Sequence, residues 1–357
     1  MGISTIAKGT FAGMVHLTVL DLGSNSISSI SHADLKDLAG LKTLILKGNA
    51  LTLLQNGTFE GLSSLEMLSL ESNSLSSLEP GTFQGLSSLK ELSLKSNSLS
   101  SLEPGTFQGL SQLRTLDLRR NLLRSLRSVG PFSGMPELRT LSMAYQRQGP
   151  TSWHIGSGTF SGNLSQLTYL DLSGECCYSL SSSYSSVIEP GALDGLTGLQ
   201  ELSLQSIGLT DAGLPAGLFL QCKSLTRLNM YYNRLSSITN KTFAGLENSL
   251  LYLTLSSNQI TKISGKAFYG FQQLYELRLD SNMISFLSAE VFTNMKIASL
   301  GQSCQCQGNL YQYVSLYGNP LVCKPDSPSN GYLSLDSGSS LPRCPSEVRS
   351  SCGQPRL

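Results

Sequence analysis

Five of the eight cysteines in this 357-residue chain lie near its C-terminus. They are Cys304, Cys306, Cys323, Cys344 and Cys352. Their segment is rich in Pro, Ser and Gly and shows no apolar periodicity, so covalent cross-links would have to hold it together. We expect at least two disulfides here, which require an oxidising compartment. A zinc site of Cys304, Cys306, Cys323 and Cys344 is the alternative, but it lacks paired C-x-x-C spacings and a nearby histidine.

Other chemistry-bearing residues argue against catalysis. The three histidines, His16, His32 and His154, have neither metal-ligand nor nucleophile spacing. Glycines recur as turn residues and form no phosphate loop or dinucleotide-binding motif. We therefore expect no enzyme activity, no cofactor and no metal.

The element that positions the remaining side chains is a repeat. The stretch SNSLSSLEPGTFQGLS at residues 72–87 returns letter for letter at residues 96–111, an interval of 24 residues. Such a period is the signature of a solenoid. Within one unit the order L-x-x-L-x-L-x-x-N-x-L-x-x-L-x-x-x-x-F-x-x-L is formed by Leu65, Leu68, Leu70, Asn73, Leu75, Leu78, Phe83 and Leu86. The alternation around Leu68 and Leu70 predicts a short strand with one buried side.

The same unit can be followed along most of the chain. Repeats open at Leu17, Leu41, Leu65, Leu89, Leu113, Leu138, Leu167, Leu199, Leu225, Leu250 and Leu274, and a last one at Tyr311. An asparagine follows most of the predicted strands and is expected to bond backbone groups as a ladder: Asn25, Asn49, Asn73, Asn97, Asn121, Asn233, Asn258 and Asn282. The ladder is expected to break at Gln146, Glu175 and Ile207.

These observations divide the chain into three parts. Residues 1–16 form a partial repeat, which suggests a fragment of a longer protein. Residues 17–321 form the repeats, with irregular, longer ones at about 138–224, and residues 322–357 form a cysteine-containing tail that Cys304 and Cys306 join. The extra residues lie at 147–163, which includes Trp153, and at 178–190. Long loops on a regular scaffold are often functional, and sequence drift of a tolerated surface loop is the alternative.

Composition excludes several classes of partner. A net charge of +1 and 14% charged residues provide no basic field for nucleic acid. The sequence contains no run of eighteen apolar residues, so no transmembrane helix is predicted. The beginning of the sequence does not resemble a signal peptide. Three N-x-S/T triplets, at Asn56, Asn163 and Asn240, are candidate glycosylation sites.

Large side chains gather on the face of the predicted sheet that the leucines leave open. The candidate ligand-binding residues are Arg114, Arg119, Arg120, Arg139, Tyr145, Tyr169, Tyr231, Tyr232, Tyr252 and Tyr275. Arg and Tyr dominate binding hot spots, and adjacent strands should place these arginines together, beside the loop that carries Trp153. Chance clustering on a solvated face is the alternative.

The repeats at residues 3–321 resemble the typical leucine-rich repeats of extracellular animal proteins, such as Toll-like receptors, Slit-like proteins, variable lymphocyte receptors and matrix proteoglycans. Asn319-Pro320-Leu321-Val322-Cys323 resembles the N-P-W-x-C opening of their cysteine-bearing C-terminal cap, with Leu321 in place of tryptophan. The resemblance implies an α/β solenoid, a curved horseshoe with a parallel concave β-sheet, short helical or 3₁₀ turns on the convex side, and this cap.

The resemblance also implies a function outside the cell. We expect recognition of a protein or glycan by the concave face, as in receptors of innate immunity. A structural or adhesive matrix protein is the second hypothesis, and a cytosolic scaffold, which predicts free thiols, is the third.

Overall fold

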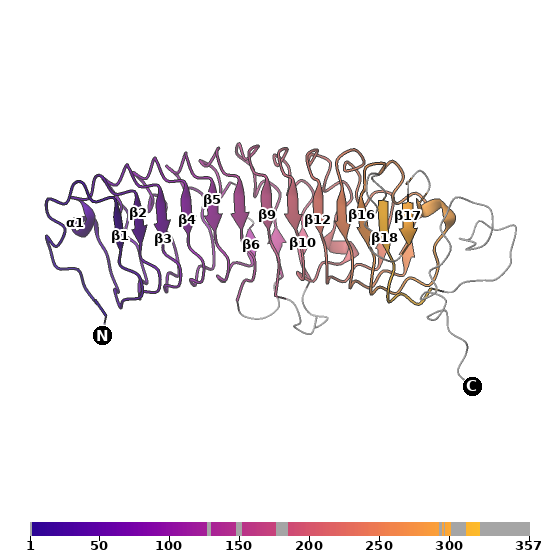
Figure 1. The fold of residues 1–357 in the computed structure, drawn as a ribbon, viewed down its shortest axis with the longest axis horizontal. Helices are drawn as coiled ribbons and strands as arrows, with labels where there is room; N and C mark the ends of the chain where they lie inside the picture. The colour runs from indigo at the N-terminus through magenta and orange to yellow at the C-terminus, as the bar shows by residue number, and fades with distance from the viewer. Residues whose placement is uncertain are drawn as a thin grey trace, which may run out of the picture.

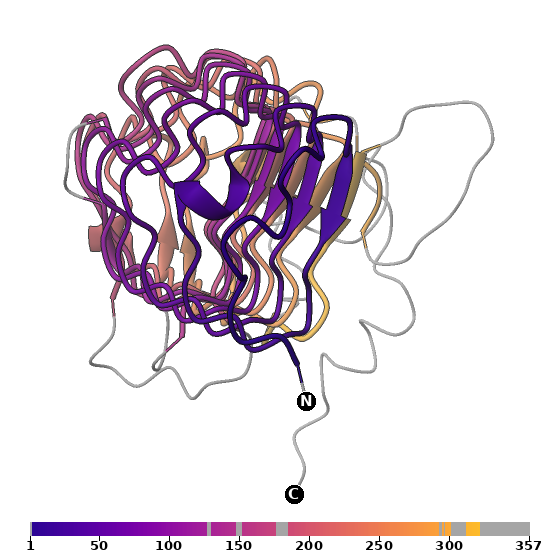
Figure 2. The ribbon, with the colours of Figure 1, turned by 90° about the vertical axis from the view of Figure 1, so that its left-hand side faces the viewer.

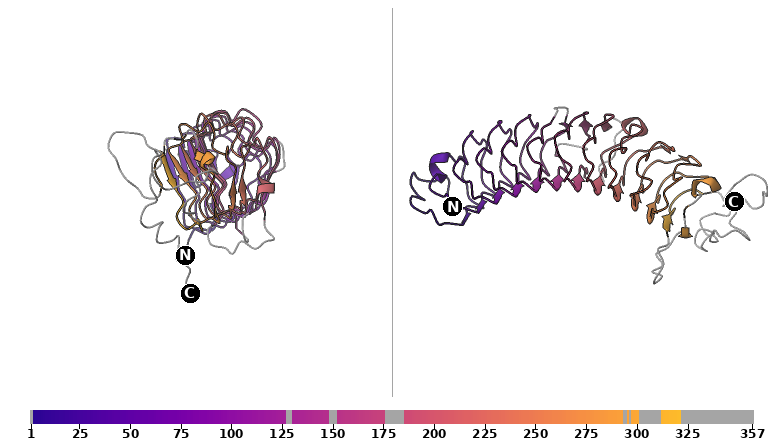
Figure 3. Two further views of the ribbon diagram at one scale, coloured as in Figure 1. Left: turned by 90° about the vertical axis from the view of Figure 1, so that its right-hand side faces the viewer. Right: turned by 90° about the horizontal axis from the view of Figure 1, so that it is seen from above.

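The chain winds into an elongated, curved solenoid (Figure 1). The computed structural model describes residues 2–126, 130–147, 152–175, 185–292, 295, 297–300 and 312–321. Within these ranges each coil contributes a short strand to a thirteen-stranded parallel sheet. Figure 3 shows this sheet along the inner side of the arch, so the predicted concave β-sheet is confirmed.

The main sheet is built from strands of three or four residues. They are β1 (Val19–Asp21), β2 (Thr43–Ile45), β3 (Met67–Ser69), β4 (Glu91–Ser93), β5 (Thr115–Asp117), β7 (Thr140–Ser142), β9 (Tyr169–Asp171), β11 (Glu201–Ser203), β12 (Arg227–Asn229), β14 (Tyr252–Thr254), β16 (Glu276–Arg278), β17 (Ile297–Leu300) and β18 (Gln312–Ser315). The last predicted repeat is in register, because Leu277 of β16 pairs with Val314 of β18, and β17 then lies outside β18 at the end of the sheet.

Two smaller parallel sheets complete the strand inventory of the described ranges. One contains β6 (Ser125–Leu126), β8 (His154–Ile155) and β10 (Val187–Ile188), and the other contains β13 (Ser237–Ile238) and β15 (Lys262–Ile263). The sequence analysis did not predict either of them. Figure 2, a view from the N-terminal end, shows such strands across the coil from the main sheet.

The convex side contains little helix. The described residues include α1 (His32–Leu35) and the 3₁₀ helices η1 (Asp211–Gly213) and η2 (Ala289–Phe292). Elsewhere single turns replace the expected helical turns, as where the Thr82 N–H donates to the Glu79 carbonyl at 3.1 Å. Gly81 and Gly85 have φ angles of +87° and +93°, which stop a helix from continuing beyond one turn.

The core follows from the repeat. Leu68 and Leu70 are 1% and 0% exposed, and burial of such a side chain contributes roughly 2 kcal/mol. Phenylalanine rings stack from coil to coil at centroid separations of 5.7–6.2 Å, in the series Phe59, Phe83, Phe107, Phe132 and Phe160. A second series contains Phe219, Phe243 and Phe268.

Several sequence predictions lie outside the described residues. These are the five C-terminal cysteines and the tail at 322–357, so the disulfides, the zinc alternative and the cap stay predictions. In the part of the chain that is described, no helix is long and apolar enough to cross a membrane.

Candidate functional site

The asparagine ladder determines how rigidly the concave sheet is held. Asn97 is 1% exposed, and its Oδ1 accepts a hydrogen bond from the Leu75 N–H at 3.1 Å. Its Nδ2 donates to the Leu70 and Leu94 carbonyls, each at 3.0 Å. One amide therefore bonds three backbone groups in two coils. The same pattern recurs at Asn49, Asn73, Asn121, Asn233, Asn258, Asn282 and Asn319.

The expected break of this ladder at Gln146 is wrong. Gln146 Nε2 donates to the carbonyls of Leu118 and Met143 at 3.1 and 2.8 Å, and its Oε1 accepts from the Leu123 N–H at 2.9 Å. A glutamine amide carries the same donors and acceptor as an asparagine amide. It therefore forms a complete rung.

The ladder lacks an amide at Glu175, which is exposed, and at Ile207, which is fully buried. In the regular pattern, an amide at either of these two positions would donate to the Leu172 carbonyl. This carbonyl instead accepts a hydrogen bond from the indole Nε1 of Trp153 at 2.7 Å. Trp153 is 1% exposed and also donates its backbone N–H to Ser186 Oγ at 2.7 Å. The Ser186 hydroxyl donates in turn to the Ile207 carbonyl at 2.6 Å.

These contacts correct the sequence interpretation of Trp153. Trp153 itself does not lie on the concave face, because its indole is buried and bonds the Leu172 carbonyl, which has no rung amide as a partner. Trp153 directly precedes β8, which pairs with β10 across the coil from the main sheet. The described parts of the two long segments are thus tied to the core and to each other.

On the concave face, the residues at the start of each strand form a continuous row, which we call the strand-start row. From one coil to the next, each backbone N–H donates to the preceding carbonyl at 2.7–2.9 Å. In order, the row consists of Lys42, Glu66, Lys90, Arg114, Arg139, Thr168, Gln200, Thr226, Leu251 and Tyr275.

The structure separates the sequence candidates between two edges of the sheet. Arg114, Arg139 and Tyr275 belong to the strand-start row, and Tyr169 and Tyr252 lie one residue further along their strands. The others lie beyond the strand ends: Arg119, Arg120, Tyr145, Tyr231 and Tyr232. Arg114 and Arg139 therefore lie side by side on adjacent strands, as expected, whereas Arg119 and Arg120 follow the end of β5, so the four arginines do not form a single cluster.

The arginines also differ in charge pairing. The guanidinium of Arg119 pairs with Asp117 through Nε–Oδ1 at 2.9 Å and Nη2–Oδ2 at 2.6 Å, and this bonding raises the pKa of Arg119. Arg114, Arg120 and Arg139 are exposed and make no ion pair with any described residue. Their charge is therefore available to a ligand.

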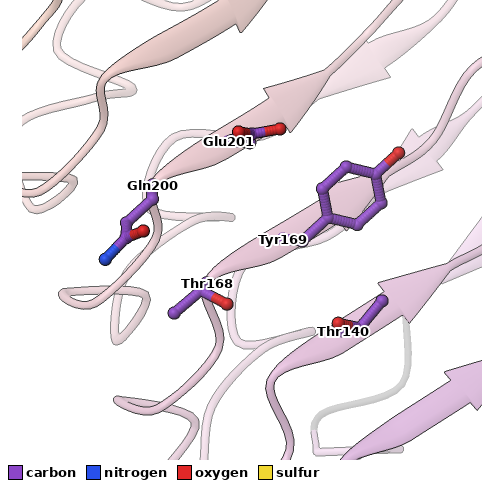
Figure 4. Close-up of a pocket in the computed structure, with 5 residues that line it drawn as sticks. All are labelled: Thr140, Thr168, Tyr169, Gln200 and Glu201. Atoms are coloured by element: carbon purple, nitrogen blue, oxygen red, sulfur yellow. The ribbon is translucent and has the colours of Figure 1, made fainter.

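A shallow hollow of about 400 Å³ lies in the middle of the concave face, lined by Thr140, Thr168, Tyr169, Gln200 and Glu201 (Figure 4). The Tyr169 hydroxyl donates to Asp171 Oδ2 at 3.5 Å. Burial, with the neighbouring carboxylates of Asp171 and Glu201, raises the pKa of Tyr169 to about 12. The phenol therefore remains a protonated hydrogen-bond donor at neutral pH.

Sequence reasoning missed Arg227, which connects the hollow to the tyrosines further along. Its Nε lies 3.3 Å from Glu201 Oε1, and its guanidinium carbon lies 4.0 Å from the centre of the Tyr252 ring. The Tyr252 and Tyr275 rings are 5.6 Å apart and tilted by 60°. The sheet register pairs Glu201, Arg227 and Tyr252 directly, so comparing equivalent repeat positions could have found this arginine.

Comparisons with known proteins agree with this architecture. Lumican of Gallus gallus is 34% identical over 118 residues, covering 32% of this chain and 33% of lumican, so the match spans about a third of that relative. Toll-like receptor 5 of Homo sapiens is 40% identical over 98 residues, which cover 28% of this chain and 10% of the receptor.

Solved structures share the fold at lower identity. The TLR13 chain of a TLR13–ssRNA13 complex matches with a TM-score of 0.66 and 24% identity, covering 90% of this chain and 40% of that one. A chain of the octameric complex of Latrophilin 3, Unc5D and FLRT2 matches with a TM-score of 0.60 and 24% identity, and the match covers 84% of this chain and 87% of that one. The profile of the family described as Leucine rich repeat matches residues 2–51, 39–99, 87–147 and 248–301. Together with the solenoid and its ladder, this match shows that the chain belongs to the leucine-rich repeat family.

Proposed function

We propose that this chain is a non-catalytic recognition module that binds a protein partner through its concave face. The observation that carries the proposal is the line of contacts from Glu201 through Arg227 and Tyr252 to Tyr275, which crosses four neighbouring strands. Arginine and tyrosine offer large contact areas and are enriched in binding hot spots. The rigid backbone beneath them lowers the entropic cost of binding.

The charge pattern of the first strands favours a protein over a nucleic acid. Glu66 lies 3.5 Å from Lys42 and 2.5 Å from Lys90, and Glu71 lies 3.3 Å from Lys47 and 3.0 Å from Lys95. In this part of the face the two glutamates form ion pairs with the four lysines. Nucleic-acid affinity, in contrast, depends on unpaired cations that face phosphates. The TLR13–ssRNA13 complex shows that the fold alone does not decide the partner.

We place this function at the cell surface or outside the cell. The sequence relatives, which include lumican, podocan and Toll-like receptor 5, are extracellular or cell-surface proteins. The predicted C-terminal disulfides require the same compartment. Mass spectrometry of the protein secreted from cells, with and without reduction, tests the location; thiols that all react without reductant would contradict it.

The binding proposal is tested by replacing Arg227, Tyr252 and Tyr275 with alanine together. Partners captured by the wild type from cell-surface extracts should be lost, while Tyr269→Ala, at an exposed tyrosine outside the sheet, should retain them. Both variants should keep the wild-type melting temperature. Equal capture by the triple variant would exclude this part of the concave face as the binding site.

A structural matrix protein is the second candidate, favoured by sequence matches to lumican, osteomodulin and podocan. Such a protein would bind through many weak contacts. The triple variant would then lose only part of its binding, in proportion to the area removed.

A further inference from the structure

The charges of the strand-start row change their pattern at β5. Lys42, Glu66 and Lys90 alternate in sign, and the glutamate pairs with both lysines. The next two strands add Arg114 and Arg139, whose backbones are joined by the Arg139 N–H to Arg114 carbonyl bond at 2.9 Å. Three cations thus follow one another on neighbouring strands. Like charges on adjacent strands destabilise a sheet. A destabilising arrangement of this kind is typical of a functional position.

Nothing in the described part of the chain compensates the two arginines. Both are exposed, and neither makes an ion pair with a described residue. The neighbouring Asp117 is held by Arg119, which lies just beyond the end of β5, with bonds of 2.9 and 2.6 Å. Arg114 and Arg139 therefore present their planar donors to the solvent above the sheet. Such donors match carboxylates, which accept two parallel hydrogen bonds from one guanidinium.

The neighbouring rows carry the opposite charge, which limits how extended an anion can be. Glu91, Asp117, Asp171 and Glu201 lie on β4, β5, β9 and β11, one to three residues further along their strands than the row itself. A dense polyanion lying along the row would be repelled by these carboxylates. A short acidic group over the start of β5 and β7 would lie closest to the two arginines, because Asp117 lies three residues further along and is paired with Arg119.

We propose that the partner presents an acidic peptide segment, with carboxylates bound by Arg114 and Arg139 and the adjoining residues lying along the strand-start row. The segment passes the hollow at Tyr169 and ends against Tyr252 and Tyr275. From β7 to β16 the sheet advances by five strand spacings, roughly 24 Å, which about seven extended residues can span. This assignment rests on the proposed function, since it specifies the partner of the same face.

The experiment selects peptides from a displayed library of random linear sequences on the immobilised wild-type chain. We expect enrichment of peptides that combine neighbouring Asp or Glu residues with aromatic or apolar residues on one side. A synthesised representative should bind Arg114→Ser/Arg139→Ser at least about tenfold more weakly. Its affinity should also fall as salt increases, because exposed charges are screened. The matched control is Lys42→Ser/Lys47→Ser, which removes two cations that are already paired and should leave affinity nearly unchanged.

The outcomes separate this assignment from the proposed function. Selected peptides without acidic residues, or bound equally by the arginine variant, would overturn the acidic-peptide assignment. If those peptides still require Tyr252 and Tyr275, the concave-face function stands; if they require neither pair, both proposals fail. Heparin oligosaccharide that binds more tightly than the peptides, and depends on both arginines, would replace the peptide by a glycan. A lower melting temperature of the arginine variant would mean that the two side chains are structural.

Discussion

The regular repeats at β2 to β5 and the irregular repeats at β7 to β11 meet the same backbone requirement with different residues. In the regular repeats one asparagine per coil bonds three backbone groups, as Asn97 does. In the irregular repeats the donors are the amide of Gln146, the indole of Trp153 and the hydroxyl of Ser186. The solenoid therefore requires that buried carbonyls be paired, and the residue type is secondary.

The same comparison shows what a departure from periodicity means here. The phenylalanine stack ends at Phe160 and is taken up again at Phe219, and Leu193 occupies the equivalent position between them. The added residues around Trp153 and Ser186 fill and bond the interior of this region, while the shallow hollow lies on its concave side. The irregular sequence thus marks a region in which Trp153 and Ser186 replace the missing ladder amides inside the coil. The candidate binding residues lie on the concave sheet, which stays regular there.

The largest effect is expected from breaking a regular rung. Asn97→Leu leaves the Leu70 and Leu94 carbonyls and the Leu75 N–H without this partner and should lower the free energy of unfolding by roughly 2 to 3 kcal/mol. Urea unfolding measures the change. Asn25→Leu, at the half-buried first rung, should cost less, and equal losses would show that burial of the ladder does not determine its contribution.

The next effect tests whether Trp153 replaces a rung. Trp153→Phe removes the indole donor to Leu172 and should cost about 1 to 2 kcal/mol. Ile207→Asn should gain little in the wild type, where the indole occupies this carbonyl, but should restore part of the loss in Trp153→Phe. A double-mutant cycle by urea unfolding measures the coupling. Strictly additive effects would show that the two side chains do not share one function.

A smaller effect is expected at Gln146. Gln146→Asn shortens the side chain by one methylene and weakens its bonds to Leu118, Met143 and Leu123, at a cost of about 1 kcal/mol. Gln146→Leu removes the bonds entirely and should cost more. If the asparagine variant were more stable than the wild type, the glutamine would be an imperfect rung rather than an equivalent one.

The smallest effect concerns acid stability of the regular repeats. Burial opposes ionisation of Glu71, but hydrogen bonds from Lys95 and Lys47 outweigh it and lower its pKa below the usual 4.5. A carboxyl whose pKa is lowered by folding stabilises the protein above the unfolded pKa and loses this contribution as pH falls through the folded pKa. The melting temperature of Glu71→Gln should therefore decline less steeply below pH 4.5 than that of the wild type. Parallel melting profiles would contradict this role.

Periodicity made most of the fold predictable, because most coils repeat the same spacing of leucine, asparagine and phenylalanine. The spacing of Leu65, Leu68 and Leu70 predicts the strand and its buried side, and the register of the last coil at Val314 followed from the same template. The concave candidates could be named but not grouped. Arg114 precedes β5 and Arg120 follows it, so the two residues lie at opposite edges of the sheet, and the bounds of the strand decide this.

The sequence by itself determined the solenoid, its concave sheet and its asparagine ladder, since these depend on contacts between equivalent positions of adjacent coils. Only the tertiary structure decided the roles of Trp153, Ser186 and Arg227. Their partners are separated by irregular numbers of residues, or belong to strands whose side chains meet only when the sheet forms. A repeat template contains no information on such contacts, because they are made once and between unlike positions.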